Sequence, residues 1–238
     1  MKSPPAIDGF QLAKNVIKHL RLSLRKLKLV DGNNFENLAL WHGRINGCFA
    51  EAGVKQGFII EVNKEFRRKW HSDFLNRYVA LYGHRGLGKW KDTSTEIDVI
   101  WLNPCDCSAI AMCEYENEGE FNIIADNIIK FHALASSTEE DCKPLLCIVS
   151  FFCEEQDSVG CHRLTDELEN LIKKEITAEK VSFKNKTFNF PPMSSWWLLI
   201  PFYGTKHNVR WRYLIENPNG RREEENEFSL NPMSSKMK

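Results

Sequence analysis

Two apolar stretches that carry acidic residues decide the fold of this chain: Ile97-Asp98-Val99-Ile100-Trp101 and Ala109-Ile110-Ala111-Met112-Cys113, the second followed at once by Glu114, Tyr115 and Glu116. Each stretch has the length and the β-branched or aromatic content of a strand, and Asn103-Pro104-Cys105-Asp106 between them is typical of a turn. The sequence therefore predicts a β-hairpin with strands at residues 96–102 and 109–116.

The acidic residues of this hairpin have a predictable arrangement. Side chains alternate along a strand, so Glu114 and Glu116 share one face and Tyr115 lies on the other. Asp98 and Glu114 are equally distant from Asp106, and a hairpin symmetric about that residue pairs them directly, with Cβ atoms about 5 Å apart. Carboxylates inside buried strands are costly unless a cation meets them, and hard oxygen ligands favour Mg²⁺ or Mn²⁺ over zinc. The hairpin therefore predicts a divalent metal site.

The rest of the chain indicates an α/β fold with a mixed central sheet flanked by helices. An apolar stripe at steps of three and four residues predicts a first helix, residues 10–27. The other expected elements are helices near 35–51, 62–81, 121–135 and 164–176, and strands at 145–152, 196–202 and 209–215. We expect residues 1–92 to form a helical N-terminal part packed on the core, residues 93–216 to form the core, and the polar residues 217–238 to be a disordered tail.

Basic residues occur at two places where a nucleic acid could be contacted. The first helix carries Lys14, Lys18, Arg21, Arg25 and Lys28, for which a solvated face is favoured over a phosphate-contacting one. The loop at residues 83–92 contains Arg85, Lys89, Trp90 and Lys91, a combination that suits phosphate contact and base stacking.

Composition excludes some classes of protein. The 32 basic and 32 acidic residues give no net charge, which argues against strong non-specific nucleic-acid binding. The apolar run at residues 196–202 is far shorter than the roughly 20 residues of a membrane helix, and the N-terminus lacks a secretory signal, so we expect a cytoplasmic protein with no membrane partner. The eight cysteines include no Cys-x-x-Cys pair, which favours reduced thiols over a zinc site.

An acid in one strand of a hairpin, followed by an acid-x-(lysine or variant) pattern in the next, resembles the PD-(D/E)XK (restriction-endonuclease-like) nuclease superfamily. The resemblance covers residues 96–152, including the helix and the apolar strand that follow the hairpin. It implies a restriction-endonuclease-like core in which Asp98 and Glu114 hold Mg²⁺ (or Mn²⁺) and Glu116 fills the usual lysine position. The Pro-Asp dipeptide of the pattern is absent, since Ile97 precedes Asp98.

The resemblance also implies roles for individual residues. The metal would polarise a phosphate oxygen and lower the pKa of a bound water, with Glu116 as a third ligand or as the base that orients this water. Lys130, on the following helix, is a substitute for the missing lysine. An additional acid from the N-terminal part, Glu65 with Glu61 and Glu51 behind it, is a candidate to join the site.

The leading interpretation is a Mg²⁺-dependent DNA endonuclease, restriction-like or repair-like, that hydrolyses phosphodiester bonds. RNA is an alternative substrate, and a homodimer is one arrangement to consider because restriction-like enzymes often pair to cut two strands. The competing interpretation is a catalytically inactive module of the same fold that binds nucleic acid or protein, which the missing lysine and the zero net charge favour. A Cys/His metalloprotein, or an unrelated α/β protein whose strand-end acids are solvated, are the remaining alternatives.

Overall fold

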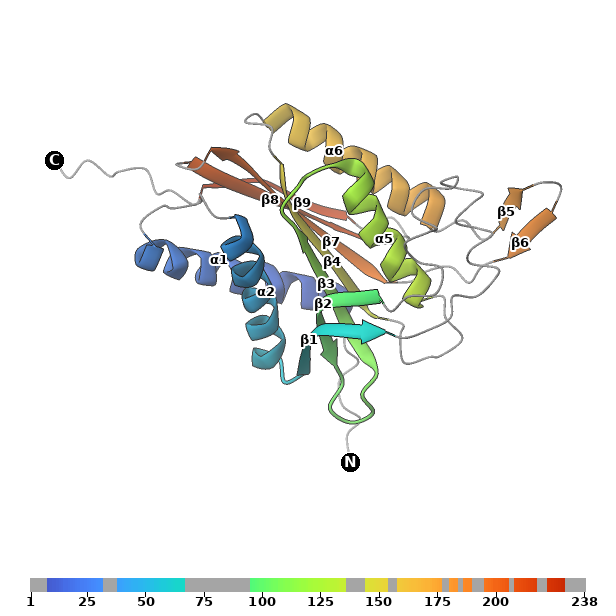
Figure 1. The fold of residues 1–238 in the computed structure, drawn as a ribbon, viewed down its shortest axis with the longest axis horizontal. Helices are drawn as coiled ribbons and strands as arrows, with labels where there is room; N and C mark the ends of the chain where they lie inside the picture. Colours follow the sequence, from blue (N-terminus) through green and yellow to red (C-terminus); the bar gives the residue numbers. More distant parts are fainter. Residues whose placement is uncertain are drawn as a thin grey trace.

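A seven-stranded mixed β-sheet forms the centre of the molecule in the computed structural model (Figure 1). The structure describes residues 8–31, 38–66, 95–135, 144–153, 158–176, 180–183, 186–189, 195–205, 208–217 and 222–229. The strands of the sheet are β1 (Ile59–Phe66), β2 (Thr95–Leu102), β3 (Ala109–Glu116), β4 (Leu146–Cys153), β7 (Trp196–Thr205), β8 (Asn208–Glu216) and β9 (Arg222–Ser229). A separate antiparallel pair is formed by β5 (Lys180–Phe183) and β6 (Lys186–Asn189).

The order of the strands across the sheet is β1-β2-β3-β4-β7-β8-β9. Strand β4 is parallel to both of its neighbours, β3 and β7, whereas every other pair in the sheet is antiparallel. All but one of the residues of β4 are buried, which agrees with a parallel strand covered on both faces. The sheet is therefore mixed, with its parallel part at the centre.

Helices cover both faces of the sheet. Helices α1 (Gly9–Asp31) and α2 (Leu38–Lys55) lie on one face, and α5 (Phe121–Ala135) and α6 (Ser158–Asn170) lie on the other (Figure 1). A π-helical segment, η2 (Leu171–Ile176), continues α6. The result is a three-layer arrangement of helices, sheet and helices.

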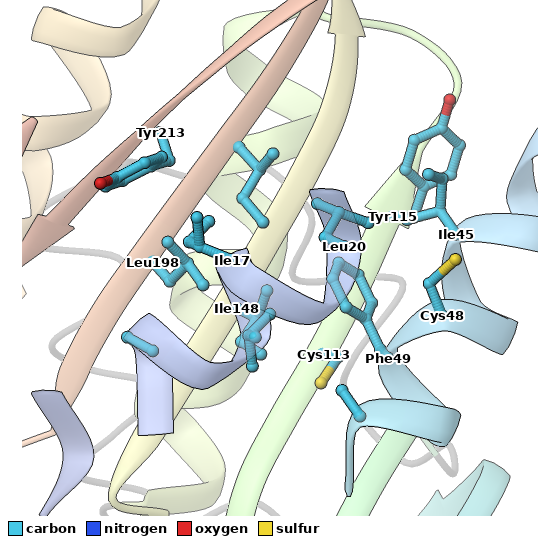
Figure 2. Packing of buried hydrophobic residues seen from close by; sticks show 14 of the residues in the cluster. Ile17, Leu20, Ile45, Cys48, Phe49, Cys113, Tyr115, Ile148, Leu198 and Tyr213 are labelled. Carbon is cyan, nitrogen blue, oxygen red and sulfur yellow. The ribbon is translucent and has the colours of Figure 1, made fainter. Parts of the chain in front are cut away.

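Each face of the sheet has its own hydrophobic core. In the first core, side chains from α1 and α2 pack on alternate residues of β3, β4, β7 and β8, as Figure 2 shows for Leu20 and Phe49 against Cys113 and Ile148. The second core joins α5, α6 and η2 to the opposite side chains of the same strands, for example Phe131 against Trp197. Burying one large apolar side chain contributes about 1.5–3 kcal/mol, so these two cores hold the layers together.

Most of the predicted elements are confirmed. The hairpin forms at Thr95–Leu102 and Ala109–Glu116, and the helix after it spans Phe121–Ala135. The expected α/β class with a mixed sheet between helices is confirmed as well. Helix α1, strands β7 and β8, and the helical segment of α6 with η2 cover the stretches predicted for them, and β4 begins one residue later than predicted.

The helix predicted at residues 62–81 is wrong for its first part. Residues 62–66 belong to β1, which pairs with β2 through contacts such as Val62↔Val99 and Lys64↔Ile97. The four-residue spacing of Val62 and Phe66 mimics a helix, but pairing with a neighbouring strand overrides such a local preference. Residues 67–81 and the basic loop at 83–92 lie outside the described residues. Because β1 joins the central sheet, the N-terminal 92 residues are not only helical.

The prediction of a disordered tail is wrong for residues 222–229. They form β9, an edge strand paired with β8 from Arg210↔Ser229 to Glu216↔Arg222. Charged side chains are common on edge strands because they discourage pairing with other chains. The acids of β9 also meet basic residues of α1, as when Glu223 pairs with Lys14, and composition alone does not reveal this complementarity. Residues 230–238 lie outside the described part of the chain.

Candidate acidic site

Asp98 and Glu114 meet across the β2–β3 hairpin. The ladder runs through Ile100↔Met112 and Val99↔Cys113, so the next residues in this register are Asp98 and Glu114. One hydrogen bond connects them, from the Asp98 backbone amide to Glu114 Oε1 at 3.4 Å. A second bond ties Asp98 to the next residue of β3, since the Tyr115 amide donates to Asp98 Oδ2 at 3.0 Å. The structure thus brings together the two acids that hairpin symmetry pairs.

The alternation of side chains along β2 breaks at Asp98. Ile97 and Ile100 pack in the second core, whereas Val99 and Trp101 pack in the first core. Strict alternation would place Ile97 on the same side as Val99. An irregularity of this kind changes the direction of a side chain, and here the Asp98 carboxylate points toward the backbone of β3, where it accepts the hydrogen bond from Tyr115.

Glu114 is buried against a lysine from α5. The ammonium of Lys130 contacts Glu114 Oε1 and also donates a hydrogen bond to the Glu96 carbonyl at 3.1 Å. Burial raises the pKa of Glu114 to about 8, while the Lys130 cation opposes this shift and the nearby Asp98 charge adds to it. The charge state of Glu114 therefore depends on a cation from α5 and on the neighbouring acid of β2.

Glu116 also faces α5, as the alternation of β3 predicts. Its Oε1 accepts a hydrogen bond of 2.6 Å from the side-chain amide of Asn127, which lies one helical turn before Lys130. Tyr115, between the two glutamates, packs in the first core on the opposite face. The predicted sharing of one face by Glu114 and Glu116 is confirmed.

His42 of α2 is a site residue that sequence reasoning missed. Its Nε2 lies 3.2 Å from Asp98 Oδ2, and its ring meets the Tyr115 ring edge-on with centroids 6.0 Å apart. The side chain is 40% exposed, so it forms the solvent-facing side of the Asp98 carboxylate. The contact arises because α2 packs across β2 and β3, and no spacing in the sequence signals it.

The additional acids expected from the N-terminal part have different surroundings. Glu51 forms ion pairs with Lys55 at 2.8 Å and with His19 at 3.2 Å, so the expectation that it joins Asp98 is not met. Glu61 and Glu65 lie in β1, where their backbones pair with Ile100 and Glu96 of β2, and the side chain of Glu65 is outside the described part of the structure.

Two carboxylates are the residues of this site that could hold a metal ion. Within the described residues, no group of three or more His, Cys, Asp or Glu side chains is placed to hold a metal. Mg²⁺ in proteins is commonly bound by one or two carboxylates, with water and substrate phosphates completing the shell. Asp98 and Glu114 are two carboxylates from neighbouring strands, with Glu114 Oε1 3.4 Å from the Asp98 backbone amide.

Comparisons of the chain with protein-family models, with curated proteins and with solved structures found no match. Among the helices that the structure describes, none has the length and apolar character needed to cross a membrane.

Proposed function

We propose that this protein is a Mg²⁺-dependent DNA endonuclease with a restriction-endonuclease-like core. The observation that carries the proposal is the meeting of Asp98, Glu114 and Lys130, which come from β2, β3 and α5. These elements, with β4, follow one another in the strand–strand–helix–strand order on which the family resemblance rests. Two carboxylates can hold a metal ion, and a metal ion polarises a phosphate oxygen and activates a water for phosphodiester hydrolysis.

Each residue has a distinct part in the proposed reaction. Asp98 and Glu114 would hold Mg²⁺ or Mn²⁺, and a metal bound there supplies a polarised phosphate oxygen and a water of lowered pKa. Lys130 favours the ionised form of Glu114, the form that binds a cation, because it opposes the effect of burial on the pKa of that carboxyl. Glu116, held by Asn127, is the candidate third ligand or the base that orients the attacking water.

Cleavage of supercoiled plasmid in Mg²⁺ or Mn²⁺ tests this proposal. We expect wild-type protein to nick or linearise the plasmid and Asp98→Ala to lose the activity. The matched control is Asp106→Ala, since Asp106 is an exposed acid in the same hairpin whose carboxylate bonds only to Ser108 among the described residues. Cleavage that survives Asp98→Ala, or that never appears with either metal, contradicts the catalytic proposal. Replacing the plasmid with RNA tests the alternative substrate.

A module of the same fold without catalysis is the second candidate. Glu116 stands in the usual lysine position, and Lys130 is buried and already in contact with Glu114, which leaves little freedom to reach a substrate. This candidate predicts salt-dependent binding of nucleic acid without cleavage, or binding of a protein partner instead. Binding measured beside the plasmid assay separates the two functions.

A further inference from the structure

A line of four basic residues runs along α1. Lys14, Lys18, Arg21 and Arg25 follow one another at steps of four, three and four residues, which places them on one side of the helix. We call these four residues the α1 basic stripe. The eleven helical steps from Lys14 to Arg25 span about 16 Å, so the stripe is long enough to follow several phosphates of a nucleic-acid backbone.

Two members of the stripe are occupied by carboxylates from β9. Lys14 Nζ lies 2.7 Å from Glu223 Oε1, and the Arg21 guanidinium contacts Glu225 Oε2. The Tyr213 hydroxyl is within hydrogen-bond distance of the same two glutamates, at 3.1 Å and 3.0 Å, so it also helps to position both carboxylates. The strand therefore presents fixed anions to alternate positions of the stripe.

The other two members, Lys18 and Arg25, are exposed, and neither forms an ion pair with a carboxylate among the described residues. The stripe is therefore half neutralised. The residues paired with β9 alternate along the helix with the other two: Arg21, which pairs with Glu225, lies between Lys18 and Arg25. An extended polyanion on the stripe would meet both open cations and would compete with β9 for the filled ones.

The anchoring of β9 does not depend on these two glutamates. Its alternate side chains point to the opposite face, where Glu224 pairs with the buried Arg212 and Arg222 pairs with Glu169 of α6 at 3.1 Å. The backbone ladder with β8 also holds the strand. Neutralising Glu223 and Glu225 therefore frees Lys14 and Arg21 without removing the strand.

We propose that the α1 basic stripe is a surface for the phosphate backbone of nucleic acid, and that Glu223 and Glu225 are built-in competitors that weaken this binding. The inference rests on the proposed function for the identity of the partner, but it requires no catalysis at Asp98. Each phosphate neutralised by a lysine or arginine releases counterions, which makes binding fall with salt. Two carboxylates already on the stripe remove two of its four contacts.

The test measures binding of a labelled DNA duplex in EDTA, where metal-dependent cleavage does not interfere. Glu223→Gln/Glu225→Gln is compared with wild type and with Asp166→Asn/Glu167→Gln, which removes the same charge from exposed positions on α6 across the sheet. We expect the first double variant to bind at least about five-fold more tightly at low salt, with a logarithmic salt slope steeper by up to about 1.8, or about 0.9 for each recovered phosphate contact. The charge-matched control should change both quantities much less.

A second pair of substitutions locates the binding on α1. Lys18→Ala/Arg25→Ala disrupts no described ion pair, and it should weaken binding in wild type and cancel the gain in the Glu223→Gln/Glu225→Gln background. Two results would overturn the inference: an equal gain in DNA affinity in Asp166→Asn/Glu167→Gln, or an affinity that Lys18→Ala/Arg25→Ala does not change. Failure of plasmid cleavage, together with this pattern of binding, would contradict the catalytic proposal but support the inference about the stripe. Cleavage that is lost in Asp98→Ala, in a protein without this pattern of binding, would support the catalytic proposal and contradict the inference about the stripe.

Discussion

The ammonium of Lys130 on α5 lies against the carboxylate of Glu114 on β3, and the two side chains are only 11% and 5% exposed. Ionising a buried carboxyl is costly unless a cation is close by. Here burial raises the pKa of Glu114 to about 8, and Lys130 acts in the opposite direction. The charge on the proposed metal ligand thus depends on one contact, which can be tested without knowing the substrate.

The first prediction concerns the pH dependence of stability. The folded-state pKa of Glu114, about 8, lies above its ordinary value of about 4.3, so the folded protein holds this proton more tightly than the unfolded chain. The resulting stabilisation is complete below about pH 4.3 and is lost as the pH rises through about 8. Relative to Glu114→Gln, wild type should therefore lose stability over this window, at up to about 1.4 kcal/mol per pH unit.

Urea unfolding in EDTA between about pH 5 and about pH 9 measures this loss. Glu118→Gln is the matched control, because Glu118 is an exposed acid just beyond the end of β3 and its removal should leave the profile parallel to that of wild type. A constant difference between wild type and Glu114→Gln across the range would show that the pKa of Glu114 is not raised.

The second prediction concerns Lys130→Met. Removing the cation raises the pKa of Glu114 further, since burial then acts without the opposing Lys130 charge. The substitution should cost more stability at high pH than at low pH, with the difference growing by up to about 1.4 kcal/mol per pH unit above the wild-type pKa. The same substitution in a Glu114→Gln background should have a cost that does not change with pH. Parallel profiles in both backgrounds would show that the two side chains are not coupled.

The parts of the fold that sequence predicts are those with local signals. Residues 109–116 and 146–153 are short apolar runs, and residues 121–135 repeat their apolar side chains with a helical period. The pairing of Asp98 with Glu114 follows from hairpin symmetry, which a two-strand unit defines by itself. Lys130 is predictable only as a residue of the next helix, because its contact with Glu114 depends on how α5 is rotated against the sheet.

The features that sequence missed depend on partners distant in the chain. β1 pairs with β2 across the intervening residues 67–94, and the spacing of Val62 and Phe66 mimics a helix until that partner is known. β9 looks like a solvated tail because the partners of its charges include Lys14 and Arg21 of α1, over two hundred residues away. His42 reaches Asp98 through the crossing of α2 over the sheet. Composition and periodicity carry no information on such contacts.

The third prediction concerns the metal. If Asp98 and Glu114 bind Mg²⁺, the ion stabilises the folded protein by about 2.7 kcal/mol at a free concentration one hundred times its dissociation constant. Thermal unfolding at alkaline pH, with Mg²⁺ or with EDTA, should therefore show a metal-dependent rise in Tm for wild type and for Asp106→Asn. Asp98→Asn should abolish the rise. An equal rise in Asp98→Asn would place the bound ion elsewhere.

The fourth prediction concerns the cysteines, which the zinc alternative would require as ligands. Cys105 and Cys107 are exposed in the hairpin turn, whereas Cys48 is buried with its pKa raised to about 11 by desolvation. The thiolate is the reactive form, so the two exposed thiols should be alkylated in the native protein while Cys48 is protected until unfolding. Peptide mapping by mass spectrometry after a short pulse of iodoacetamide reads out each site. Protection of Cys105 and Cys107 that a chelator reverses would favour a metal bound by thiols.

The fifth prediction uses the two faces of β9. Glu224 pairs with Arg212, whose side chain is 1% exposed, whereas Glu223 pairs with Lys14 at the surface. Removing one member of a buried ion pair leaves an uncompensated charge and costs about 3–5 kcal/mol, but an exposed pair contributes about 0.2–1 kcal/mol. Glu224→Gln should therefore lower the free energy of unfolding by about 3 kcal/mol, less to the extent that Glu224 is hydrated, and Glu223→Gln by less than about 1 kcal/mol.

Urea unfolding of the two variants side by side makes each the control for the other, because both replace a glutamate by glutamine in the same strand. Replacing Arg212 as well, in Glu224→Gln/Arg212→Met, should recover much of the lost stability, since the orphaned cation is then gone. Equal, small losses for Glu224→Gln and Glu223→Gln would mean that the Arg212 contact is hydrated in solution. In that case β9 would be held by its backbone ladder with β8 and by the packing of Phe228 on Trp211, and not by its charges.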